Sequence, residues 1–480
     1  MRVFGVLRRG ALGLWTGILV SSCSVGPNYQ RPTAPVSLTY KEQQDWKLAV
    51  PNDTIDRGAW WSIYRDPLLD QLERQVNVSN QNIKQVEAAV RQARAQAREQ
   101  QSSYFPSLSV TSQAERQGTS NNAIPVYSVT GTATWEPDFW GKIRRNVESS
   151  AAGAQATAAQ LAGARLSAQA TVATDYFELR FSDSLKDLFT QTVKSDERAL
   201  TIAQNQYNAG IVARSDVINA QAQLLTAQAQ LVNSGLQRAQ LEHAIAVLTG
   251  RPPNDVSIPV GRLPDRIPIV PTSLPSALLE RRPDIAQAER QMQEQSALIG
   301  VQIATYFPTI NLSAVAGYTG NVAASLFSPA NAVWSLVANG TQTILSGGQR
   351  RASVEAARAS YDASVANYRE VVLAAFQNVE DELAALRILE QQIAVETAAI
   401  AASQHALDIT LNEYQAGTVA YTAVITAQLT LLGNQETALQ VQQDRLVASV
   451  ALVQALGGGW DASQLPSIHD LQRVPIPIPD

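Results

Sequence analysis

The chain has 480 residues, of which 45% are hydrophobic, 6% aromatic and 16% charged, and its net charge is -5. That balance excludes a strongly basic nucleic-acid-binding surface. The single cysteine, Cys23, excludes an intrachain disulfide. His243, His405 and His469 lie far apart in sequence and show no spacing typical of a metal site or a catalytic triad. We therefore expect no enzyme, no metal and no dissociable cofactor.

The N-terminus has the pattern of a leader. Arginines precede an apolar run at 11–20, and two serines follow before Cys23. A charged start, a short apolar run and small residues are typical of a secretory signal peptide, which we predict at residues 1–22. Val20-Ser21-Ser22-Cys23 resembles the bacterial lipoprotein signal, which implies a covalent lipid on Cys23. Ser24 in place of aspartate implies the outer membrane. The alternative is an uncleaved leader with an unmodified cysteine.

An arm and a first helix follow the leader. Residues 23–66 contain several prolines and predict an extended arm. Asp66 followed by Pro67 is typical of a helix N-cap with proline at the first helical position. We predict one helix from Leu68 to about Ser103.

Two stretches, 105–137 and 307–345, alternate between apolar and small polar residues. A period of two predicts β-strands, because successive side chains point to opposite faces. Each stretch is long enough for a hairpin, so we predict four strands. The residues that we predict to face lipid are Leu108, Val110, Val129, Trp135, Ile310, Leu312, Trp334 and Leu336.

These hairpins have two possible interpretations. A soluble hairpin would bury its apolar face in a core, but the flanking segments are helical and too polar to cover a sheet. The other interpretation is a membrane-spanning hairpin, apolar towards lipid and polar towards a lumen. Four strands cannot close a barrel, and an open edge cannot exist in lipid. The second interpretation therefore requires a barrel shared between chains.

Long helical segments follow each hairpin. The first runs to Tyr207 without an internal proline, and a return helix ends near Gly250. A Pro-rich link at 251–283 follows. The second segment runs from Gln349 to Tyr414, and its return helix ends near Leu456, before a tail at 457–480.

The two halves repeat the same order of elements. Residues 67–250 and 284–456 each predict a helix, a hairpin, a long helix, a turn and a helix. Tyr-Phe-Pro at 104 and 306, and Tyr-x-x-Gly at 207 and 414, occur in the same order in both halves. The sequence therefore predicts an internal duplication.

The long helices carry modest apolar faces among alanine and glutamine. Small residues on two flanks favour a helix packed between two neighbours, as in a cylinder of helices. The alternative is an exposed coiled-coil stalk without a channel. Lipid-facing strands count against a stalk.

With these features in order, the sequence resembles the TolC-like outer-membrane efflux proteins, in their lipoprotein branch. The resemblance covers nearly the whole chain. Its carriers are Cys23, Val25-Gly26-Pro27-Asn28-Tyr29-Gln30-Arg31-Pro32, Trp60-Trp61, Tyr64-x-Asp66-Pro67-x-Leu69, Glu280-Arg281-Arg282-Pro283-Asp284-Ile285, and the repeated Tyr-Phe-Pro and Tyr-x-x-Gly motifs.

The resemblance implies a mainly α protein with a transmembrane β part. Three chains would form a twelve-stranded β-barrel, four strands from each, continuous with a periplasmic α-helical barrel and a mixed equatorial domain. It implies passive export of drugs or small toxic compounds. The partners would be a periplasmic adaptor and an inner-membrane resistance-nodulation-division transporter.

The resemblance also places the two helix turns at the periplasmic tip, where they would close the tunnel and meet the adaptor. Gly210 permits a left-handed backbone, and we expect Asp216 to cap the next helix. Val419, Ala423 and Thr426 stand where several relatives carry charged residues, so we expect closure to depend on tyrosines and helix packing. The expected tip residues are Tyr207, Gly210, Asp216, Tyr414, Gly417, Tyr421, Ala423 and Thr426.

Basic residues follow both hairpins, at Lys142, Arg144, Arg145, Arg350 and Arg351. They are expected either to be solvated or to lie at the level of the lipid headgroups.

Two other functions stay open at this point. One is an outer-membrane duct for type I protein secretion, and the other is a structural lipoprotein that conducts nothing. The leader and the Arg-Pro-Asp segment favour drug efflux by resemblance alone.

Overall fold

The computed structural model describes residues 24–34, 39–43, 59–119, 122–268, 270, 278–467 and 470. The predicted signal peptide at 1–22 and the predicted acylation at Cys23 lie outside these residues. So do parts of the predicted arm, link and tail.

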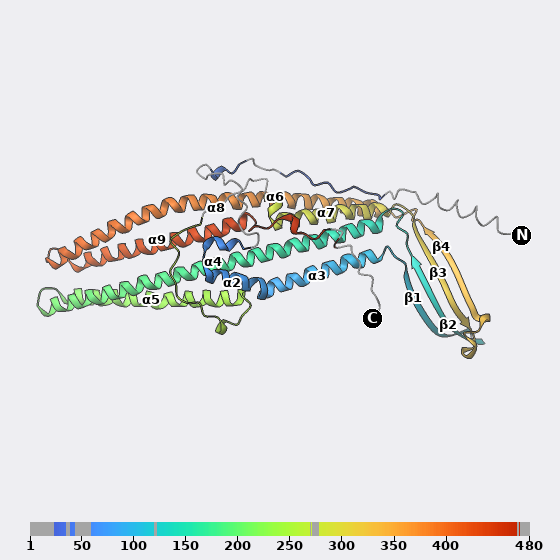
Figure 1. Ribbon diagram of the computed structural model, residues 1–480, viewed down its shortest axis with the longest axis horizontal. Helices are drawn as coiled ribbons and strands as arrows, with labels where there is room; N and C mark the ends of the chain where they lie inside the picture. The colour runs from blue at the N-terminus through green and yellow to red at the C-terminus, as the bar shows by residue number, and fades with distance from the viewer. Residues whose placement is uncertain are drawn as a thin grey trace.

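The described chain is an elongated bundle of helices with a β-sheet at one end (Figure 1). The turns of two long helical hairpins lie at the opposite end. None of the helices within the described ranges is long and apolar enough to cross a membrane. The helices are α2 (Pro67–Ser79), α3 (Gln81–Ser102), α4 (Lys142–Asn208), α5 (Arg214–Leu248), α6 (Leu278–Arg281), α7 (Pro283–Ala304), α8 (Gln349–Gln415) and α9 (Tyr421–Ala455).

The helix lengths confirm the duplication. α3 and α7 both have 22 residues, α4 and α8 both have 67, and α5 and α9 both have 35. α7 begins 202 positions after α3, whereas α8 begins 207 positions after α4. The offset therefore changes within the second hairpin. There, two short 3-10 turns, η5 (Ala323–Ser325) and η6 (Pro329–Asn331), enlarge the loop.

The first helix is two helices, so the prediction of one continuous helix to Ser103 is wrong. Asn80 leaves the helical conformation, with φ -59° and ψ 123°. Its side chain accepts a hydrogen bond from Ile83 N at 3.0 Å, which caps α3, and donates to Leu248 O at 2.8 Å. Capping by a short polar side chain competes with helix continuation. The predicted cap at Asp66 is confirmed, because its carboxylate accepts from Leu68 N and Leu69 N.

The main hydrophobic core lies half-way along the bundle. Trp60 and Trp61, from the short helix η2 (Trp60–Tyr64), pack with residues of α2, α4, α8 and α9. Trp60 is 1% exposed, and its indole N–H donates to Gln169 Oε1 at 3.1 Å. Burial of these aromatics joins the two halves of the duplication at one level.

The sheet has four antiparallel strands in the order β1-β2-β3-β4. They are β1 (Ser107–Thr119), β2 (Asn122–Trp135), β3 (Thr309–Gly320) and β4 (Ala332–Thr341). Pairing between β2 and β3 joins the two hairpins into one sheet. In the described part of the chain no strand lies along the outer edge of β1 or β4.

Candidate functional site

The strand register places all the predicted lipid-facing residues on one face of the sheet. Residues directly opposite on neighbouring strands share a face. Trp135 lies opposite Leu312, Val129 opposite Tyr318, and Trp334 opposite Ala316. The other predicted members follow the same register, with Leu108 opposite Ala133, Val110 opposite Gly131, Leu312 opposite Ala338, Leu336 opposite Ala314, and Ile310 opposite Gly340. No helix covers this face among the described residues, and Leu108, Val110, Trp334 and Leu336 are all more than 70% exposed.

The opposite face of the sheet is mostly small and polar. Ser107 and Thr134 share a hydrogen bond of 2.7 Å across β1 and β2. The alternation is incomplete, because Ile124 and Val126 of β2 and Val315, Val333 and Val337 of β3 and β4 also lie on the polar face. The period-two pattern alone did not reveal these residues, because each has an apolar neighbour on either side. The two faces differ in polarity as a wall between lipid and water requires.

Tryptophans fix the junction between the sheet and the helices. Trp135 Nε1 donates to Tyr104 O at 3.0 Å, and Trp140 Nε1 donates to Pro308 O at 2.8 Å. Trp140 also stacks on Phe307, with ring centroids 4.8 Å apart. An amphipathic indole suits a boundary between an apolar layer and water.

The expectation that Arg145 is solvated is wrong. Its side chain is 4% exposed and is bonded to residues of the N-terminal arm. Arg144 and Arg351 are exposed, as expected for residues near water. Arg350 lies over the ring of Tyr306, with 5.3 Å from its guanidinium carbon to the ring centroid.

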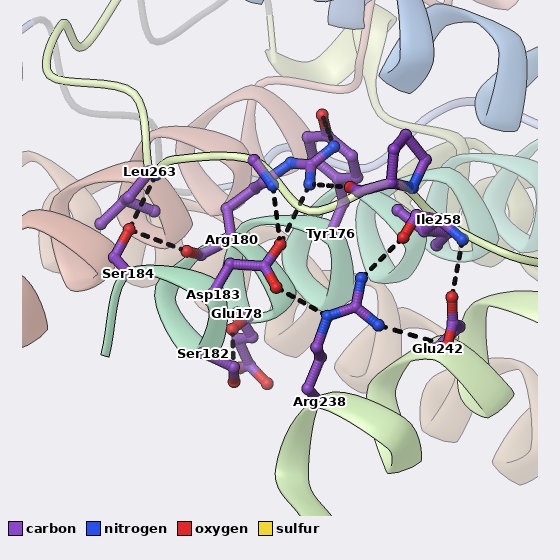
Figure 2. A network of polar contacts seen from close by, with 12 residues as sticks. Tyr176, Glu178, Arg180, Ser182, Asp183, Ser184, Arg238, Glu242, Ile258 and Leu263 are labelled. Carbon is purple, nitrogen blue, oxygen red and sulfur yellow. Dashed lines mark hydrogen bonds and ion pairs between the residues drawn. The ribbon is translucent and has the colours of Figure 1, made fainter. Parts of the chain in front are cut away.

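A buried polar network lies at the equatorial level (Figure 2). Asp183 on α4 is 3% exposed and accepts hydrogen bonds from Arg180, Arg238 and Gly261 N. Arg238 on α5 also donates to Ile258 O at 2.6 Å. The network therefore ties the link segment to both helices of the first long hairpin.

In the second repeat, the arginine at the equivalent position binds a different segment of the chain. Arg387 is 207 positions after Arg180 and pairs with Glu42 at 2.6 Å. Glu380 accepts from the backbone N–H groups of Lys41 and Glu42. Each repeat thus uses its long helix to fasten one equatorial segment, the link in the first and the arm in the second.

The two tip turns have the same backbone geometry. Gly210 has φ +75° and Gly417 has φ +71°, a left-handed conformation that favours glycine. Ile211 N donates to Gln206 O at 2.9 Å, and Thr418 N donates to Glu413 O at 3.0 Å. This pattern ends each long helix and reverses the chain.

The side chains at the two tips differ. Tyr414 and Tyr421 are 6% and 2% exposed, whereas Tyr207 is 40% exposed. The buried pair packs in a cluster with Val217 and Ala220 of α5, which joins the two helical hairpins. Within the chain, Tyr414 and Tyr421 therefore pack the second turn against the first hairpin, whereas Tyr207 lies exposed.

The remaining expected tip residues are polar or small. Asp216 does not cap α5, because the N-cap position is Ala213 and Asp216 is the third residue of the helix. In the first turn of α5, its negative charge interacts favourably with the positive end of the helix dipole. Ala423 is half-buried. Thr426 is exposed, and its hydroxyl donates to Thr422 O within α9.

Sequence reasoning missed Asp196 on α4. Its side chain is 2% exposed, and its Oδ2 has no hydrogen-bond partner in the described part of the chain. Burial raises the pKa of Asp196 to about 6. Burial and then the charge of Asp196 raise the pKa of Tyr421 to about 12. The sequence signal that could have identified Asp196 is its position in the helix. Val193, Asp196 and Leu200 have the spacing of an apolar helix seam.

Comparison with known proteins fits this geometry. Residues 72–251 and 274–458 match the family described as outer membrane efflux protein. The chain belongs to that family. This efflux protein is therefore an outer-membrane channel and not an enzyme. Its open-edged sheet and long helical hairpins are the parts of such a channel that one chain supplies.

Individual relatives match more than nine-tenths of the efflux protein. It is 29% identical over 461 residues to the antibiotic efflux pump outer membrane protein ArpC of Pseudomonas putida, covering 93% of this chain and 94% of ArpC. It is 28% identical to the toluene efflux pump outer membrane protein TtgC of Pseudomonas putida, with the same coverage. Its fold is similar to the open state of the MtrE outer membrane channel of Neisseria gonorrhoeae. The TM-score is 0.80, with 26% identity and coverage of 92% and 99%.

Proposed function

We propose that three copies of this chain form a continuous duct that serves as the outer-membrane exit of a tripartite efflux pump. The observation that carries the proposal is a four-stranded sheet with one apolar face and two open edges, continuous with helices of 67 residues. An open sheet edge is not stable in lipid, so β4 of one copy pairs with β1 of the next. Twelve strands then close the barrel.

Two exposed apolar stripes support a seam between copies along the helices. On α5 the stripe repeats every seven residues, at Ile218, Leu225 and Val232. On α8 it repeats at the same interval, at Ile388, Val395, Ala402 and Ile409. A seven-residue repeat is the pattern of a helix that packs along one partner helix.

The position of these helices favours a partner from another chain. Within the chain α4 packs on α9, which leaves α5 and α8 as the outer helices of the row. α8 runs towards the tip and α5 runs away from it (Figure 1). When α5 of one copy packs antiparallel against α8 of the next, the residues of the two stripes therefore meet in order along the helices. The next residues round α5 are polar, at Asn219, Thr226 and Asn233, and face water.

The tip closes the duct at rest. Tyr414, Tyr421 and the apolar residues around them hold the second helical hairpin against the first. Opening separates these groups. Tyr207, Gly210 and Asp216 in the first turn, and Gly417, Ala423 and Thr426 in the second, form the surface that a periplasmic adaptor meets.

The cargo and the anchor complete the proposal. An inner-membrane resistance-nodulation-division transporter and the adaptor load the duct, which conducts drugs or small toxic compounds passively. The names of ArpC and TtgC, which mention antibiotics and toluene, support this class of cargo. Acyl chains on Cys23 hold the protein in the outer membrane.

Conductance across a planar bilayer tests the duct. Purified trimer carrying Tyr421→Ala, which loosens the tip, should pass a steady current. Absence of current from a correctly folded trimer would favour the alternative of a structural lipoprotein. Export of an unfolded polypeptide but not of small dyes would favour type I protein secretion. Metabolic labelling with palmitate should mark the wild type but not Cys23→Ser.

A further inference from the structure

Residues 24–28 are held in the junction between the sheet and the helices. Val25 N donates to Trp140 O at 3.1 Å, and Ser24 lies directly against Gly141. Trp140 is itself fixed by Phe307 and by Pro308 O. This short segment, immediately after the position of Cys23, therefore contacts α4 and Trp140, and Trp140 in turn contacts the two residues before β3.

Arg145 is the centre of these contacts. Its Nε donates to Val25 O at 3.3 Å, and its Nη2 donates to Gly26 O at 3.3 Å and to Asn28 Oδ1 at 2.8 Å. Its Nη1 pairs with Glu148 at 2.7 Å. A guanidinium that is 4% exposed is costly to bury, and these four acceptors compensate for its lost hydration.

Two glycines let the arm approach this arginine. Gly26 has φ +94°, and a Cβ built there would fall 2.5 Å from the Cα of Gly300 on α7. A Cβ on Gly300 would fall 2.9 Å from Cγ of Arg145. Both distances are shorter than a real carbon contact, so the site has no room for a side chain at either position.

The internal duplication shows that this site is special to the arm. The position equivalent to Arg145 in the second repeat is Ala352, and the position equivalent to Gly300 in the first repeat is Arg98. The duplication therefore contains no second copy of this pair of an arginine and a glycine, although α4 and α8 have equal lengths. The difference between the repeats occurs where the N-terminal arm lies.

We propose that Arg145 is the positioning residue of a clasp, made with Gly26, Asn28 and Gly300, that holds residues 24–28 at the sheet–helix junction. Cys23 is adjacent to Ser24, so the clasp sets the height at which its acyl chains enter the bilayer, beside the end of the apolar sheet face. The effect on the height of the acyl chains rests on the proposed acylation of Cys23, whereas the docking of the arm does not depend on the lipid.

A spin label on Pro27→Cys tests the clasp in the full-length trimer. Pro27 is exposed between Gly26 and Asn28, and acylated Cys23 has no free thiol to react. In the wild-type background we expect a slow-tumbling spectrum. Arg145→Met should shift the ratio of docked to released arm by about 10- to 100-fold, since it removes hydrogen bonds to a charged group. The matched control Arg351→Met, at an exposed arginine in the first turn of α8, should leave the spectrum unchanged.

Further variants keep the result independent of folding. Gly300→Ala should release the arm while Arg145 is retained, and Arg145→Lys should restore part of the docking. Equal mobility of the label in wild type, Arg145→Met and Gly300→Ala would overturn the clasp. Mass spectrometry of the N-terminal peptide separates the two proposals. An unmodified Cys23 in the wild type would contradict the lipid anchor. A mobile arm in Arg145→Met whose Cys23 is still acylated would support the clasp.

Discussion

Tyr414 packs against Tyr421 across the turn between α8 and α9, with 5.2 Å between ring centroids and 55° between ring planes. Both rings are buried in the cluster that joins the two helical hairpins at the tip. Their counterparts in the first repeat, Tyr207 and Arg214, are exposed. The two halves of the duplication therefore contribute unequally to closure.

This asymmetry predicts different effects of removing a buried tyrosine and an exposed tyrosine at the tip. Tyr421→Ala removes a fully packed ring, which costs about 3–5 kcal/mol of packing free energy in a well-packed core. We expect a large rise in single-channel open probability across a planar bilayer. Tyr207→Ala, at the exposed first tip, should change it little. Equal increases for both variants would show that the aromatic pair does not close the tip.

The buried carboxyl of Asp196 predicts pH dependence at the tip. Its pKa is raised from its ordinary value to about 6, so the packed tip favours the protonated form. The stabilisation from this group is present at low pH and is lost as pH rises through about 6. Open probability should therefore be higher at about pH 7.5 than at about pH 5.

Variants of two carboxylates separate this effect from a general one. Asp196→Asn keeps the side chain neutral, so the tip should stay closed at both pH values. Asp408→Asn, at an exposed carboxylate on α8, should keep the wild-type pH response. Persistence of the response in Asp196→Asn would mean that another group titrates.

The equatorial network predicts a strong dependence of stability on one aspartate. Asp183→Ala leaves Arg180 and Arg238 without their shared carboxylate, and breaking a buried ion pair costs about 3–5 kcal/mol. We expect a clear fall in the temperature at which the detergent-solubilised trimer dissociates. Asp187→Ala, one helical turn further along α4, removes only exposed contacts with Arg262 and Gln191 and should cost about 1 kcal/mol or less. A similar loss for both would contradict the role of the network.

The periodic features were predictable from sequence. Alternation gave the strands of the sheet, repeated Tyr-x-x-Gly motifs gave the tip turns, and Asp66-Pro67 gave a helix start. Each of these signals lies within a few residues along the chain, where local geometry determines the outcome.

The missed features depend on partners that are distant in sequence. Asn80 breaks a helix because its side chain reaches both Ile83 and Leu248. Arg145 is buried because the arm, more than 100 residues earlier, covers it. Asp183 needs the link segment to complete its contacts. No local pattern identifies such partners, since they meet only when the chain folds.

The stripe on α5 predicts that one substitution blocks assembly. Leu225→Asp places a charge in the proposed seam, where it would be desolvated without a partner. We expect monomers in detergent, measured by light scattering, with helical content retained. Thr226→Asp, on the neighbouring polar flank, should leave the trimer intact. Trimers from both variants would place the seam elsewhere.

The two faces of the sheet should meet different solvents, lipid on the apolar face and water on the polar face. Spin labels placed singly along β1, β2 and β3, in protein reconstituted into lipid vesicles, report contact with oxygen in lipid or with a water-soluble nickel complex. We expect oxygen contact at Val110, Val129 and Leu312 and nickel contact at their neighbours Ser109, Thr130 and Ser313. Labels at all six positions that respond alike, or that are shielded from both reagents, would contradict this expectation.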